Sequence, residues 1–163
     1  MQSEDKKLNI PEIRKFLINL QNNICGSIEA EEKKYFESDA WEKKGTGKLD
    51  GDGITKIIEG GKIIERGGVN FSHVSGNSLP DSATKIRPEL VGREFNALGL
   101  SLVFHPLNPY IPTVHMNIRF FCASKGNQGD VWWFGGGMDL TPYYIFEEDA
   151  IHFHKCCKKS LDP

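Results

Sequence analysis

The stretch VHMNIRFF, residues 114–121, decides the fold class because apolar and polar side chains alternate along it. Successive side chains of a β-strand point to opposite faces of a sheet. The apolar members therefore share one face: Met116, Ile118 and Phe120. The polar members share the opposite face: His115, Asn117 and Arg119. We expect a strand with one face in the core and one polar face.

Two further strands are expected beside this one, at residues 99–105 and 131–134. In the first of them Ser101 and His105 alternate with apolar residues. The segment between this strand and the one at 114 contains three prolines, and we interpret it as a loop because proline is excluded from central strands. An antiparallel hairpin would bring the two polar faces together and place His105 near His115. A merely solvated outer face is the alternative that this pattern leaves open.

Segments with the periodicity of a helix precede and follow the strands in the sequence. After Asn9 and Pro11, apolar residues recur every three or four positions: Ile13, Phe16, Leu17, Leu20, Ile24 and Ile28. A second helix is expected over residues 146–159, with acidic residues in its first turn. The sequence therefore predicts an α+β fold, an antiparallel β-sheet flanked by helices. We expect a single domain over residues 1–163, with residues 1–9 as a disordered tail.

Two short β-branched runs, 54–58 and 62–64, predict a β-hairpin around Gly60 and Gly61. The segment that begins at Asp50 resembles the start of a calcium-binding loop. Its spacing excludes such a loop, because Gly61 stands where the bidentate glutamate belongs.

Composition excludes several classes of protein. The 163 residues are 39% hydrophobic and 26% charged, which is typical of a globular domain, and the net charge of -2 argues against a nucleic-acid partner. No apolar run is long enough to span a membrane, and the polar N-terminus is unlike a signal peptide. We therefore expect a cytoplasmic protein. The four cysteines lack metal-ligand or disulfide spacing and are interpreted as free thiols.

The polar residues of the central strand suit an acidic substrate. Histidine transfers protons near neutral pH, and the guanidinium group of Arg119 matches a carboxylate. The run WWFGGGMD, residues 132–139, would let a flat ligand approach the backbone beside Asp139, although a glycine-rich β-bulge is an equal alternative. His152 and His154 point in different directions on a helix, so only one of them should face a cleft.

Four segments resemble the oxygen-dependent coproporphyrinogen III oxidases. They are GVNFSHV (68–74), LVFHPLNPY (102–110), HMNIRFF (115–121) and WWFGGGMDLTPYY (132–144), and their order and spacing also match. The similarity extends from about residue 10 to the end of the chain. The radical-SAM enzymes that perform the same conversion are excluded, because their cysteine motif is absent.

This resemblance implies oxidative decarboxylation of two propionate groups of coproporphyrinogen III to vinyl groups, which yields protoporphyrinogen IX. O2 is the co-substrate, and no organic cofactor is implied. The resemblance implies that His115 donates a proton and that His105 and His154 bind a divalent metal such as Mn. It also implies four substrate contacts: Ser101, Asn117, Ile118 and Arg119. We interpret Asp139 as the carboxylate that accepts hydrogen bonds from the pyrrole N–H groups.

The family's sequences continue for about as long again beyond the position of Pro163, and the family forms homodimers. We therefore expect a truncated chain of low or no activity, with an incomplete family fold and a doubtful dimer. A non-catalytic fragment that binds a tetrapyrrole or anion is the alternative function. A weaker alternative is an unrelated metalloenzyme that uses His105, His115 and His154 as ligands.

Overall fold

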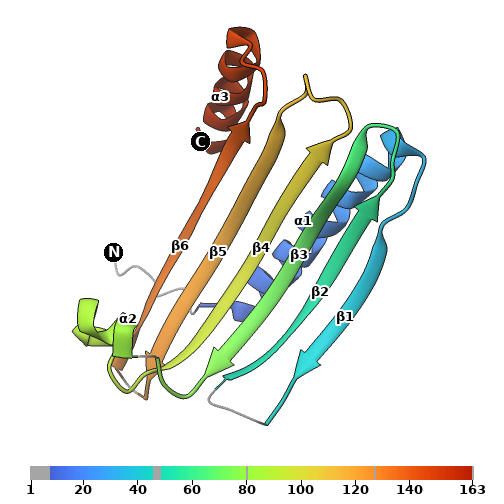
Figure 1. The fold of residues 1–163 in the computed structure, drawn as a ribbon. Helices are drawn as coiled ribbons and strands as arrows, with labels where there is room; N and C mark the ends of the chain where they lie inside the picture. The colour runs from blue at the N-terminus through green and yellow to red at the C-terminus, as the bar shows by residue number, and fades with distance from the viewer. Residues whose placement is uncertain (1–7, 46–48, 80, 127, 163) are drawn as a thin grey trace, which may run out of the picture.

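The computed structural model describes residues 8–45, 49–79, 81–126 and 128–162. Six strands form one antiparallel sheet whose spatial order equals the chain order (Figure 1). The strands are β1 (Glu37–Lys43), β2 (Leu49–Glu59), β3 (Ile64–Gly76), β4 (Glu94–Pro106), β5 (Thr113–Lys125) and β6 (Gln128–Thr141). The helices are α1 (Ile10–Glu32), α2 (Asp81–Ile86), the 3-10 turn η1 (Pro88–Leu90) and α3 (Glu147–Leu161).

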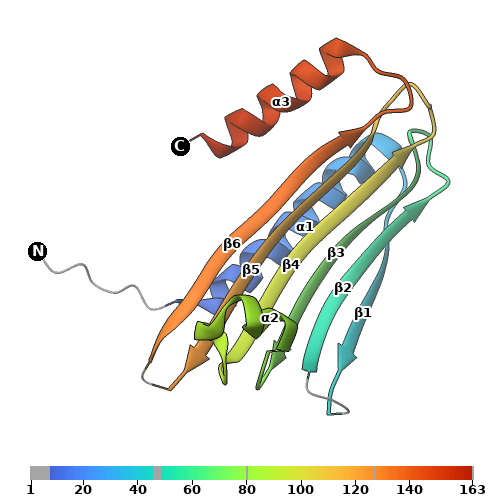
Figure 2. The ribbon, with the colours of Figure 1, turned by 60° about the vertical axis from the view of Figure 1, so that its left-hand side comes forward.

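Helix α1 lies along one face of the sheet, against β3 and β4 (Figures 1 and 2). Its Leu17 and Cys25 are buried in one apolar core with Val69, Phe71 and Leu100 of the strands. Removal of these side chains from water is the main favourable contribution to folding. The alternation predicted for β5 is confirmed, because its apolar residues pack on this core: Val114, Met116, Ile118 and Phe120.

Polar side chains fix the position of α1 on the sheet. Gln21 is fully buried, and its amide donates hydrogen bonds of 2.8 Å to the carbonyl oxygens of Ile54 and Val69. One turn from the N-terminal end, Arg14 forms a two-pronged ion pair with Asp52, at 3.1 and 2.5 Å. The carboxylate of Asp52 is thus paired with Arg14, and the residue lies within β2. Both facts agree with the exclusion of a calcium-binding loop.

The C-terminal end of α1 is tied to the β2–β3 turn by a buried carboxylate. Glu32 is 2% exposed and accepts hydrogen bonds from the backbone N–H groups of Lys62 at 2.6 Å, Ile63 at 3.0 Å and Ile64. A buried charge is tolerated only when it is well hydrogen-bonded, and three backbone donors meet that requirement.

The predicted elements are confirmed, with longer bounds. The amphipathic helix begins after Asn9, whose side chain accepts a hydrogen bond from the N–H of Glu12, and continues to Glu32. The predicted hairpin is β2–β3, the three predicted strands are β4, β5 and β6, and the second helix is α3. The four cysteines are free thiols.

Three details of the structure differ from what the sequence suggested. The glycines of β6 do not form a bulge, because their pairing with β5 is continuous and the register shift lies between Ala123 and Lys125. Residues 1–7 of the expected tail lie outside the described residues, but Leu8 packs against the core and Asn9 caps α1. Phe16 belongs to the apolar stripe of α1 yet is 60% exposed, beside an open groove that Trp132 and Phe134 also line.

Strand β1 and helix α2 were not predicted from the sequence. Strand β1 gave no signal because it is exposed along its whole length and carries no alternation of apolar residues. None of the helices in the described part of the chain has the length and hydropathy needed to cross a membrane.

Candidate active site

The sheet face turned away from α1 carries most of the predicted site residues, and we call it the polar face. Antiparallel pairing aligns its residues in rows across β4, β5 and β6. One row contains Ser101, Asn117 and Gly137, and the next contains Val103, His115 and Asp139. Because cross-strand neighbours on one face lie about 5 Å apart, each row forms a continuous strip of surface.

His115 and Asp139 form the best-defined contact on the polar face. The Nδ1 atom of His115 lies 2.7 Å from Oδ1 of Asp139. An ionised carboxylate only accepts hydrogen bonds, so Nδ1 of His115 carries the hydrogen. This leaves Nε2 of the ring free for a second proton. The side chains are 43% and 61% exposed, so both are open to a ligand.

The pKa of Asp139 is lowered from its ordinary value of 3.8. The hydrogen bond with His115 is the largest cause; loss of solvation opposes it, and a weaker hydrogen bond from Thr141 acts in the same direction as His115. Hydrogen-bond donors stabilise the charged form of a carboxyl group and so lower its pKa. Asp139 is therefore an acceptor at neutral pH.

His105 lies beside this pair, as the predicted hairpin required. Its ring meets that of His115 edge to face, with centroids 6.4 Å apart. The Nδ1 atom of His105 lies 3.3 Å from the hydroxyl group of Thr113. The two imidazoles therefore meet at the loop end of β4 and β5.

Arg119 and the glycines of β6 form the next part of the polar face. The backbone of Arg119 is paired with Gly99 and Gly135 on the neighbouring strands, and its guanidinium group makes no ion pair or hydrogen bond to a described residue. A Cβ atom added at Gly135 or Gly137 would meet no heavy atom within 4 Å. The surface beside Arg119 is therefore open down to the backbone, which favours contact with a flat anionic ligand.

Ile118 does not share this face. Its side chain packs against the core on the α1 side of β5, as alternation along the strand requires. Any contact of Ile118 with a ligand on the polar face would have to use its backbone. The resemblance named the segment 117–119 without distinguishing its two faces.

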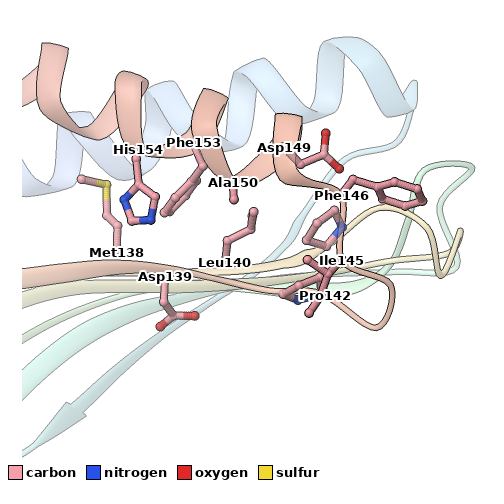
Figure 3. Close-up of a pocket in the computed structure, with 11 residues that line it drawn as sticks. Met138, Asp139, Leu140, Pro142, Ile145, Phe146, Asp149, Ala150, Phe153 and His154 are labelled. Atoms are coloured by element: carbon pink, nitrogen blue, oxygen red, sulfur yellow. The ribbon is translucent and has the colours of Figure 1, made fainter.

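His154 also lies on the other side of the sheet. It comes from α3, which packs over β6 on the side to which Met138 and Leu140 point, whereas Asp139 points away (Figure 3). A pocket of about 250 Å³ separates α3 from the strand, lined by His154, Phe153 and Met138 among others. His152 lines a different, more open pocket of about 390 Å³ together with Cys156.

A divalent metal held jointly by His105 and His154 does not fit this arrangement, because the two residues lie on opposite faces of the sheet. Across the described residues, no group of three or more His, Cys, Asp or Glu side chains is placed to hold a metal ion. The metal stays a prediction without support from the geometry of the chain.

Two threonines on the polar face were missed by the sequence analysis. Thr113 and Thr141 are cross-strand partners, and they contact His105 and Asp139 respectively. Period-two alternation from His115 and Asp139 would have placed both on the polar face. Nothing in the sequence showed which side chains they would reach.

Comparison of the sequence with known protein families identifies the family of this chain. The family model described as coproporphyrinogen III oxidase matches residues 12–163, which include all six strands and α3. A match over that span covers nearly every element described above. The chain therefore belongs to the coproporphyrinogen III oxidase family.

Proposed function

We propose that the protein binds coproporphyrinogen III on the polar face and catalyses its oxygen-dependent oxidative decarboxylation to protoporphyrinogen IX. The observation that carries the proposal is the hydrogen-bonded pair of His115 and Asp139 on the same open face as the unpaired Arg119. For each propionate group, loss of CO2 and of two hydrogen atoms leaves a vinyl group, and O2 takes up two electrons and two protons to become H2O2.

Arg119 is the proposed anchor for a substrate carboxylate. It stands four residues from His115 on the same face of β5, which is about 14 Å along the strand. A propionate chain and an arginine side chain together bridge such a separation. Asn117 and Ser101 lie in the row between them and offer neutral hydrogen bonds to the same or a neighbouring carboxylate.

Asp139 is the proposed acceptor for the pyrrole N–H groups. Its lowered pKa keeps it ionised, so it accepts hydrogen bonds from the pyrrole N–H groups and makes the pyrrole ring more electron-rich. An electron-rich pyrrole is able to transfer electrons to O2 without a flavin or haem. His115, once its Nε2 has taken up a second proton, is the proposed proton donor to the reduced oxygen.

The open glycines support a flat substrate over a compact one. Gly135 and Gly137 leave room directly above the backbone of β6, next to Asp139 and Arg119. A macrocycle lying there contacts the sheet along its plane and directs its carboxylates along the strands.

A non-catalytic tetrapyrrole- or anion-binding role is the second candidate. It is favoured by the exposure of the His115 and Asp139 side chains, 43% and 61%, because active sites that handle reactive intermediates usually exclude water. Both candidates use the same face, so only turnover separates them.

The test is aerobic turnover of coproporphyrinogen III by the purified chain, read as porphyrin fluorescence after oxidation of the products. We expect conversion that ceases without O2 and that is lost in His115→Ala and Arg119→Ala. His152→Ala, which removes an exposed histidine of α3, is the matched control and should keep wild-type turnover. Tight substrate binding without conversion would support the second candidate, and absence of both would contradict the two proposals together.

A further inference from the structure

Asp139 has two hydrogen-bond donors on a single oxygen atom. Its Oδ1 accepts from Nδ1 of His115 at 2.7 Å and from the hydroxyl group of Thr141 at 3.1 Å. Within the described part of the chain, Oδ2 accepts no hydrogen bond. The carboxylate is thus held by one oxygen and free at the other.

A carboxylate on an exposed strand would otherwise rotate. The Asp139 side chain is 61% exposed, so solvent surrounds much of it. A single hydrogen bond to His115 permits rotation about that bond, whereas two donors that approach the same oxygen from β5 and from β6 define the plane of the group. Thr141 supplies the second donor from two residues further along β6.

We propose that Thr141 is a positioning residue that acts through Asp139. Its hydroxyl group fixes the carboxylate so that Oδ1 stays with His115 and Oδ2 is presented to the pyrrole N–H groups of the substrate. This inference rests on the proposed function for its catalytic consequence, but its structural part concerns only Asp139 and His115.

Thr141→Val tests the proposal, because valine keeps the shape of threonine and lacks the hydroxyl group. Its expected effect is a fall in kcat of about tenfold or more with a much smaller change in KM, since removal of a hydrogen bond to a charged group is costly. Thr141→Ser restores the hydroxyl group and should keep kcat within about threefold of wild type. Thr55→Val, on β2, which β3, β4 and β5 separate from Thr141 on β6, is the matched control outside the proposed site.

A second measurement does not depend on activity. The ¹⁵N chemical shifts of the His115 ring, recorded where the imidazole is neutral, report which nitrogen carries the hydrogen. The Nδ1–H form is expected to dominate in the wild type and in Thr141→Ser, and to give way to a mixture of both forms in Thr141→Val.

Unchanged kcat and unchanged ring shifts in Thr141→Val would overturn the proposal. Equal loss in Thr141→Val and Thr141→Ser would also overturn it, because the hydroxyl group would then not be the cause. If the wild-type chain shows no turnover, the proposed function fails while the ring shifts still decide the role of Thr141.

Discussion

The Glu32 carboxylate of α1 lies directly over Gly61, so that a Cβ atom on Gly61 would come within 2.5 Å of Oε2. The glycine lets the turn between β2 and β3 approach the helix closely enough for its backbone N–H groups to reach the carboxylate. The helix end and the hairpin are therefore one structural unit.

We expect Glu32→Ala to lower the free energy of unfolding by about 2–4 kcal/mol, because it leaves buried backbone N–H groups without acceptors. Urea denaturation at neutral pH measures the change. Glu31→Ala, an exposed neighbour on the same helix, should alter stability by less than about 0.5 kcal/mol. Equal effects of the two substitutions would show that the hydrogen bonds to the turn contribute little.

Substitution of two adjacent glycines of β6 by alanine should affect stability differently. A Cβ atom at Gly136 would collide with the carbonyl oxygen of Asn117, so Gly136→Ala should destabilise the protein by about 1–3 kcal/mol. Gly137→Ala meets open space and should leave the midpoint of urea denaturation nearly unchanged. It should nevertheless weaken binding of coproporphyrinogen III, because the methyl group occupies the proposed substrate surface. Unaltered binding by Gly137→Ala would place the substrate elsewhere.

Loss of His115 should raise the pKa of Asp139 toward 3.8, since the hydrogen bond with His115 is the main cause of its depression. The contribution of this contact to stability is present above the unfolded-state pKa and is lost as pH falls through the lower folded-state value. The ¹³C shift of the Asp139 carboxyl group, followed from pH 7 to acid, measures the change in His115→Ala. His105→Ala is the control, because His105 does not contact the carboxylate; the same shift in both variants would contradict the assignment.

The cysteines should divide into two classes of reactivity. Burial raises the pKa of the Cys25 thiol to about 11, and it also raises that of Cys122. Both are buried, whereas Cys156 is exposed and Cys157 is half-buried on α3. A thiol-specific chromogenic reagent at pH 8 should therefore modify Cys156 and Cys157 rapidly in the native protein and all four after unfolding. Rapid native modification of Cys25 would mean that α1 does not pack as described.

The helices and strands in which apolar residues recur at regular spacing were predictable from the sequence. Alternation along β5 placed His115, Asn117 and Arg119 on one face, and the hairpin argument placed His105 beside His115, as the structure shows. Other features depend on long-range packing. The side of the sheet on which α3 lies depends on how the helix packs against β6, where Phe153 and Met138 line one pocket, and no local pattern indicated that His154 would be separated from His105.

The same reason explains the contacts that were missed. Gln21 looks like a polar interruption in an apolar helix, and its two carbonyl partners become visible only when β2 and β3 are aligned beneath it. Thr141 stands beside Asp139 by simple alternation, but the sharing of one oxygen with His115 depends on the register of β5 and β6.

The up-and-down order of the strands also bears on how the chain reaches its native state. Every strand pairs with its sequence neighbour, so most pairings close a short loop and have a low entropic barrier; the longer connection from β3 to β4 contains α2 and η1. Contacts of α1 are different, because Gln21 bridges to Ile54 and Val69 across 33 and 48 residues. Hairpins are thus expected to form early and docking of α1 late, so substitutions at Gln21 should mainly accelerate unfolding while leaving the refolding rate nearly constant.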